Sequence, residues 1–277
     1  MSFAAVQRTR RIETVPPLLV AGIACVFGND NIMGPWTELA AETEEDWDAF
    51  TLHLGSKVGR VAWNYSLFEI GIGSVGNEVV LLPTYPCSTV VSGAVEDAFP
   101  LYIAKGSRVV FRGRCEEISG IQSLQVKLFG HVRNAFAPTG YTECVALNVS
   151  ASRAYLGTKV NGPTDVIGNY GSWAQITAAT PWTPSSVRFV VGSNIDANLS
   201  NGNSFGYTIR LAVGLQGEEV VIANHFGQVG TQRSQFRQLA MHESLQLPAN
   251  ARLSAQCAAD SIGATGRSCM YGLYFFR

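Results

Sequence analysis

Two stretches of this sequence show the same order of features: YSLFEIGIGSVGNEVVLLP at residues 65–83 and YTIRLAVGLQGEEVVIAN at residues 207–224. Each begins with an apolar segment, continues into a Gly-rich segment and then reads Glu-Val-Val. Farther along, an Arg followed by alternating apolar residues recurs in both places, as Arg108 and as Arg252. A repeat this long indicates duplicated domains rather than a short-period solenoid. The sequence therefore predicts two tandem copies of one domain.

The repeated segments have the pattern of β-strands. Apolar residues occupy every second position at Val61, Trp63, Tyr65 and Leu67, which is typical of a half-buried strand. Further short apolar segments recur about 8–12 residues apart, with Gly, Pro and Asn between them. This pattern predicts an all-β fold of two tandem duplicated β-sandwich or jelly-roll-like domains.

The predicted domain limits follow from the repeat. Residues 1–17 are expected to form an N-terminal arm, residues 18–140 the first copy and residues 141–277 the second copy. The arm contains Arg8, Arg10 and Arg11, which would either solubilise a disordered segment or dock on a neighbouring subunit. Residues 36–48 have local helix propensity, but the matching stretch of the second copy contains Thr and Pro. A shared fold therefore favours strand and loop there.

Composition restricts the classes of function. The chain has 277 residues, a net charge of −1 and 15% charged residues, so no overall positive field would attract nucleic acid. No apolar run approaches about 18 residues, and no membrane span is expected. The apolar run at residues 18–27 follows two prolines and is expected to be a strand rather than a secretory signal.

Cysteine and histidine spacing predicts no metal site, no cofactor and no catalytic set. None of the six Cys lies in a CxxC pair, and none of the four His lies in a metalloprotease motif. Cys257 and Cys269 flank a Gly/Ser loop and leave two alternatives open. They could form a disulfide across a hairpin, or they could be small buried side chains.

Two further motifs have alternative interpretations. Residues 71–76 read GxGxxG, but β-branched residues and a Pro follow where a dinucleotide site would need a helix, so a turn between strands is favoured. An acidic run could bind a cation, but it lacks the Gly turn of a calcium loop and is expected to be a solvated face. The run consists of Glu42, Glu44, Glu45, Asp46 and Asp48.

Aromatic residues supply the candidate ligand-binding positions. Trp47 and Trp182 occur at matching places in the two copies. Their rings could stack on a sugar, or they could belong to the core of each copy. Core packing is the favoured interpretation because both copies keep the residue.

Residues 70–83 and 98–115 resemble a group of tailed-bacteriophage virion proteins of unassigned role. The shared text is roughly DIGxGxxGxExVLIP followed by FPxxIPxGxRIxAR, and it covers about 70 residues of each copy. Differences include Glu69 in place of Asp and Ala104 in place of Pro, and the second copy keeps Pro248 and Arg252 but loses Phe-Pro. The matching residues of the first copy are Ile70, Gly71, Gly73, Gly76, Glu78, Pro83, Phe99, Pro100, Ile103, Gly106 and Arg108.

The resemblance implies a non-enzymatic structural component of a phage particle, on its tail, neck or capsid surface. Such a protein would be made in the host cytoplasm and located in the virion. Its expected partners are other copies of itself and other virion proteins. The alternative is a carbohydrate- or receptor-binding module on the virion, which would contact a host surface glycan.

Overall fold

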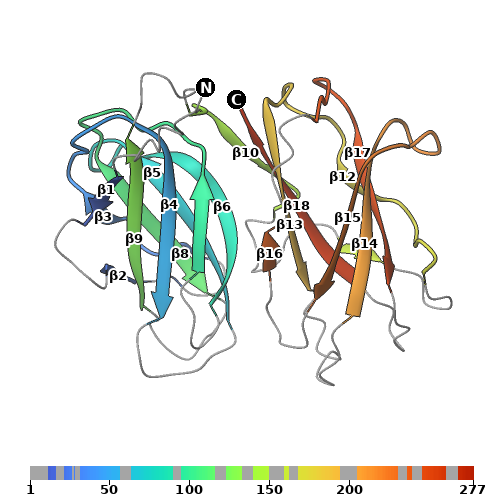
Figure 1. Cartoon of the computed structure of the whole chain (residues 1–277), viewed down its shortest axis with the longest axis horizontal. Coiled ribbons are helices and arrows are strands. Elements are labelled where there is room, and N and C mark those ends of the chain that lie inside the picture. The colour runs from blue at the N-terminus through green and yellow to red at the C-terminus, as the bar shows by residue number, and fades with distance from the viewer. Residues whose placement is uncertain are drawn as a thin grey trace, which may run out of the picture.

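The structure is a computed structural model in which two β-sandwiches stand side by side (Figure 1). All regular elements in the described part of the chain are strands. The described residues are 12–16, 22–26, 28, 32–56, 64–89, 95–115, 123–132, 140–149, 159–161, 168–193, 205–229, 236–238, 245–259 and 268–277.

The first sandwich contains two antiparallel sheets. One has the strand order β1-β9-β4-β7, with β2 also paired to β9, and the other has the order β3-β8-β5-β6. The strands are β1 (Ile12–Val15), β2 (Ile23–Val26), β3 (Thr37–Ala40), β4 (Trp47–Ser56), β5 (Asn64–Ile72), β6 (Val79–Thr89), β7 (Val95–Phe99), β8 (Val109–Cys115) and β9 (Ser123–Val132).

The second sandwich repeats this arrangement. Its sheets have the orders β10-β18-β13-β16, with β11 also paired to β18, and β12-β17-β14-β15. The strands are β10 (Cys144–Leu147), β11 (Lys159–Asn161), β12 (Ala174–Thr177), β13 (Ser186–Ser193), β14 (Phe205–Val213), β15 (Val220–Val229), β16 (Phe236–Gln238), β17 (Leu253–Ala259) and β18 (Ser268–Phe276).

Each strand of the first sandwich has a counterpart nine places later in the second. Both halves pack a five-stranded antiparallel sheet against a four-stranded one, so the predicted all-β fold of β-sandwich or jelly-roll type is confirmed. This common order is the arrangement that a duplicated sequence would produce, and duplication itself stays a prediction. Residues 36–48 form β3, a loop and the start of β4, so shared topology overrides the local helix propensity as expected.

The predicted arm extends too far. Ile12–Val15 forms β1 and pairs with β9 from Ile12 opposite His131 to Val15 opposite Leu128. The expectation that residues 1–17 lie outside the sandwich is therefore wrong for this segment, because its alternating side chains complete the edge of a sheet. Arg8, Arg10 and Arg11 lie outside the described residues, and their proposed role stays a prediction.

Alternation along β4 explains how the first core forms. Phe50, Leu52 and Leu54 are buried between the two sheets, whereas His53 lies on the opposite face and is half-buried. The second sandwich has its own core cluster, which includes Phe189, Leu211 and Leu273. Some residues of the second sandwich join the core cluster of the first instead, namely Val190, Tyr274 and Phe276. The two sandwiches therefore share an apolar interface.

Cys257 is a buried side chain in this second core and forms no disulfide. The disulfide alternative with Cys269 is therefore wrong for this structure, and the small buried side chain is the observed state of Cys257. No helix in the described residues is long and apolar enough to span a membrane.

Candidate functional site

The segment that carries the resemblance forms a tight turn between β5 and β6. Gly73 and Gly76 have φ angles of +119° and +82°, which favour glycine. The Glu78 carboxylate accepts the Gly76 backbone N–H at 3.1 Å. Arg108 donates to the Gly73 carbonyl at 3.1 Å and to Glu78 at 3.0 Å. The GxGxxG text is thus a turn between strands, as the sequence predicted, and an Arg–Glu pair holds it.

The second sandwich holds its turn with the same contacts. Gly214 and Gly217 have φ angles of +132° and +89°. Glu219 accepts the Gly217 N–H at 2.9 Å, and Arg252 donates to the Gly214 carbonyl at 3.0 Å and to Glu219 at 3.1 Å. The motif that the two sandwiches share therefore builds the same local structure in each of them.

We call the Arg–Glu pair that holds each of these turns a clasp. The carboxylates of the two clasps, Glu78 and Glu219, are held in the ionised form. The pKa of Glu78 is lowered by its own backbone N–H and then by Arg108 and the Gly76 N–H, against partial desolvation. For Glu219, desolvation raises the pKa, but its own backbone N–H, Arg252 and the Gly217 N–H together lower it below the usual value. The charge of each Glu therefore fixes the turn at neutral pH.

Immediately after each clasp, the turn exposes valine side chains. Val79 is 65% exposed and its counterpart Val220 is 62% exposed; the following Val80 and Val221 are also exposed. The β5–β6 and β14–β15 turns lie at the same end of the molecule, the upper end in Figure 1. The two sandwiches therefore present matching apolar groups at one end. We call these four valines the valine pairs.

A second cluster of functional side chains lies where the sandwiches meet. Arg188 of β13 points its guanidinium at Asp97 of β7, with Nη1 to Oδ1 at 3.4 Å, and donates to the Ala98 carbonyl. Tyr85 donates to the other Asp97 oxygen at 2.7 Å. The guanidinium also lies 4.8 Å from the centre of the Phe99 ring. One cation of the second sandwich is thus bound by the first.

This cluster is buried from solvent. Burial raises the pKa of Asp97, although Arg188, Tyr85 and the Ala98 backbone N–H lower it in part. Burial, followed by the Asp97 charge, raises the pKa of Tyr85 well above its usual value. The Tyr274 hydroxyl completes the junction by donating to the Thr84 carbonyl at 2.5 Å. The buried ion pair therefore bridges the two sandwiches, and breaking it would leave an uncompensated buried charge at their junction.

Sequence reasoning missed this junction. Arg188 is a charge inside the apolar text SVRFVV, and that interruption of a strand is the signal that could have singled it out. The pairing depends on how two separate sandwiches pack, and strand periodicity does not contain that information.

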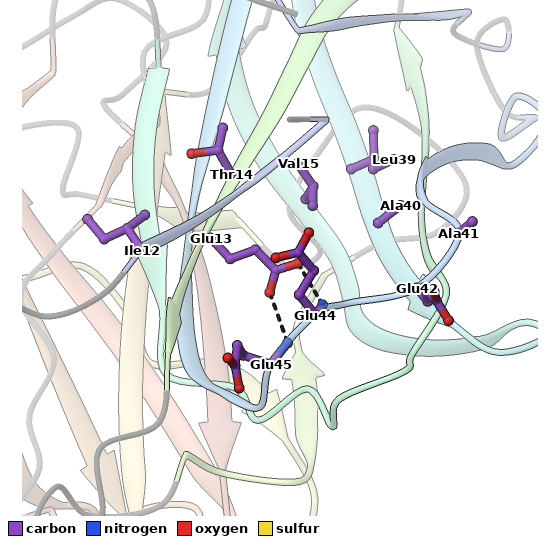
Figure 2. A pocket seen from close by; sticks show the side chains of 10 residues that line it. All are labelled: Ile12, Glu13, Thr14, Val15, Leu39, Ala40, Ala41, Glu42, Glu44 and Glu45. Carbon is purple, nitrogen blue, oxygen red and sulfur yellow. Dashed lines mark hydrogen bonds between the residues drawn. The ribbon is translucent and has the colours of Figure 1, made fainter. Parts of the chain in front are cut away.

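A cavity of about 410 Å³ opens beside β1 and is lined by several carboxylates (Figure 2). Glu13 points into the loop before β4 and accepts the backbone N–H groups of Glu44 at 2.8 Å and Glu45 at 3.3 Å. It also accepts the Trp47 indole N–H at 2.6 Å. Glu13 therefore holds this loop against β1. No group of three or more His, Cys, Asp or Glu side chains in the described ranges is placed to hold a metal ion.

The two candidate tryptophans have different surroundings. Trp47 is fully buried and its indole packs against Gly130, so the ligand-stacking role suggested for it is wrong and the core interpretation fits. Trp182 is half-buried, with the Phe275 ring centre at 6.0 Å and the Arg277 guanidinium at 4.8 Å from its own ring centre. Only Trp182 of this pair keeps exposed ring surface.

No known family model and no curated protein matches this chain. Among solved structures, PNGF-II superposes with a TM-score of 0.42 at 8% identity over 96% of this chain, which spans 65% of that protein's length. The CBM22-1–CBM22-2 tandem domain of Paenibacillus barcinonensis Xyn10C gives a TM-score of 0.26 at 9% identity, covering 98% of this chain and 92% of that one. The structure of the infectious bursal disease virus Gx strain gives a TM-score of 0.27 at 10% identity, covering 97% of this chain and 71% of that one. With TM-scores below 0.5, none of these similarities carries a functional argument.

Proposed function

We propose that this protein is a non-enzymatic structural component of a bacteriophage particle, acting through subunit–subunit contacts on the tail, neck or capsid surface. The observation that carries the proposal is the exposure of the valine pairs at one end of the molecule. Val79 and Val220 have nearly the same exposure, and the same Arg–Glu clasp positions each of them. Apolar surface that is rigidly presented in this way favours coverage by another protein surface.

The resemblance to phage virion proteins supports the same proposal. Its matching text includes Gly73, Gly76, Glu78 and Arg108, which together build the turn that presents the valines. In this structure the shared residues hold a turn and expose the valines that follow it, rather than forming a set of groups aimed at a substrate. A protein that contains this turn twice could occupy two similar positions in an assembly.

Particle incorporation tests the proposal. Particles purified from infected cells that produce a tagged chain should contain it at a fixed copy number through successive gradients. The double variant Val79→Ser/Val220→Ser should fold but stay in the unincorporated fraction. The control Val75→Ser changes an exposed valine within the first turn that has no apolar partner position in the second copy, where Gln216 stands. Absence of the unaltered chain from particles would contradict the proposed location.

The glycan-binding alternative now depends on Trp182, because Trp47 is buried. The ring of Trp182 has one neighbour in Phe275 and another in Arg277, and its remaining surface could stack on a sugar. Its aromatic neighbour Phe275 is fully buried, so among the described residues this ring contact supplies no second exposed ring for a platform. The structural proposal is therefore preferred.

A further inference from the structure

The contact between the two sandwiches joins unlike surfaces. The second sandwich contributes the outward face of β10, β18 and β13, from which Tyr274 and Arg188 project. The first sandwich contributes its edge at β6 and β7, with Tyr85 and Asp97. The Tyr85 and Tyr274 rings lie 4.9 Å apart. We call the surface formed by β10, β18 and β13 the sheet face, and the surface at β6 and β7 the edge. Both sandwiches share one strand order, so each has a sheet face and an edge, and only one of each is used within the chain.

The unused sheet face belongs to the first sandwich and consists of β1, β9 and β4. The strand registers match its positions to those of the used face. Thr51 pairs with Phe129 as Arg188 pairs with Tyr274, so Phe129 occupies the place of Tyr274. Ile12 pairs with His131 as Cys144 pairs with Phe276.

This unused face has the apolar groups that a contact would need. Phe129 is half-buried, and Ile12 is 51% exposed although it begins a strand. The residues that match them in the second sandwich, Tyr274 and Cys144, are covered by the first sandwich and pack with its core cluster.

The unused edge belongs to the second sandwich and includes β15. Its Phe226 is 84% exposed, the largest exposed fraction among the large apolar side chains of the described residues. On β6, Pro86 has the same register position, because Leu67 pairs with Pro86 and Thr208 pairs with Phe226. Pro86 is buried. The edge strand of the second sandwich thus exposes an aromatic ring at a position that is buried in the first.

We infer that copies of this chain associate head to tail, with β15 of one copy against the outward face of β1, β9 and β4 of the next. The contact repeats between chains the arrangement that already joins the two sandwiches within one chain. Phe226 would pack against Ile12 and Phe129 of the neighbouring copy. The inference rests on the self-association in the proposed function and adds which surfaces meet. A heterologous contact of this kind leads to a closed ring or a filament rather than a two-fold dimer.

Complementary blocking variants test the inference. Phe226→Glu removes the edge contact but keeps the sheet face, and Ile12→Glu does the reverse. A buried carboxylate opposite an apolar surface should weaken the contact at least about tenfold. By mass photometry, each variant alone should be a monomer at a concentration where the unaltered chain forms larger assemblies. An equal mixture of the two should form a dimer and nothing larger, because one intact edge and one intact face remain.

The control is Ile32→Glu, which changes an exposed apolar residue that belongs to neither surface and lies two residues before Gly34, whose backbone N–H donates to the Gly113 carbonyl of β8. It should assemble as the unaltered chain does. Urea unfolding of each variant shows whether the fold is retained, and Phe226→Ser with Ile12→Ser serves as a milder pair if a Glu variant unfolds.

Three outcomes would overturn the inference. Assembly that persists in both blocking variants, or a mixture that stays monomeric, would show that other surfaces meet. In the first case self-association and the proposed particle role would survive. An unaltered chain that is monomeric at all concentrations but present in particles would exclude head-to-tail contact while leaving the particle role intact. Absence from particles despite head-to-tail assembly would contradict only the proposed location.

Discussion

Replacing Arg188 with Met should destabilise the protein by about 3–5 kcal/mol, because it leaves the Asp97 carboxylate buried without its cation. Arg188 and Asp97 side chains are 3% and 8% exposed, and the charged atoms are 3.4 Å apart. At an effective dielectric constant of about 20, this separation corresponds to about 5 kcal/mol of attraction. The Tyr85 hydroxyl still donates to Asp97 in the variant, which favours the lower part of the range.

The assay is urea unfolding at pH 7, followed by tryptophan fluorescence. A second variant, Arg188→Met/Asp97→Asn, removes both charges and should recover much of the loss, because no buried carboxylate is left unpaired. Arg277→Met is the control. Its guanidinium lies only 2.6 Å from Glu143, but both side chains are about half exposed, and its loss should cost no more than about 1 kcal/mol.

The effect of Arg188→Met should also depend on pH in a definite direction. Burial already raises the folded-state pKa of Asp97, and removing Arg188 takes away a charge that lowers it. When the folded-state pKa of a carboxyl exceeds its unfolded value, here about 3.8, the protein loses stability as pH rises through the folded-state pKa. The deficit of the variant should therefore be largest near neutral pH and shrink toward pH 4. A loss below about 1 kcal/mol at pH 7, or an equal loss in Arg277→Met, would refute the reasoning.

Three further changes have defined outcomes. Gly130→Ala would place a Cβ 2.0 Å from the Trp47 indole and should cost at least about 1–3 kcal/mol in urea unfolding, whereas Gly55→Ala, with 3.7 Å to its nearest neighbour, should be neutral or slightly stabilising. Glu13→Gln weakens the charge-assisted bond to the Trp47 indole and should lower stability by about 1–2 kcal/mol; unchanged unfolding would show that the loop is held by other contacts. Trp182→Ala should leave binding in a glycan array unchanged if the structural proposal is right, and a lost signal would favour the alternative.

The sequence contained the information for each sandwich because that information is local. Gly73, Gly76, Glu78 and Arg108 recur with fixed spacing, and the turn they form needs positive φ angles and one charge pair. Strand alternation then places Phe50, Leu52 and their counterparts in a core. The same reasoning predicted strand and loop at residues 36–48 correctly because a similar stretch of the second half could be compared with it.

The surroundings of Trp47 and Ile12 were harder to predict from the local sequence. A Trp at the start of a strand has no periodicity that separates a buried ring from an exposed one, and the residue that decides is Gly130 on the partner strand β9. Ile12 was assigned to an arm because the segment before Pro16 is short and rich in Arg. Its pairing with His131 is a contact across more than a hundred residues, which local pattern does not reveal.

The junction at Arg188 connects these observations to function. A surface contact specifies how two subunits touch, but the shape of an assembly also depends on the angle between the two contacts of each subunit. In this chain the unused sheet face lies on one sandwich and the unused edge on the other, so the junction sets that angle. A purely apolar junction could slide, since burial of apolar area is not directional. The Arg188–Asp97 pair, with Tyr85 on one oxygen and the Ala98 carbonyl on the guanidinium, restricts the two sandwiches to one arrangement. In the proposed assembly the buried charges would give a defined geometry to contacts whose affinity would come from exposed apolar side chains.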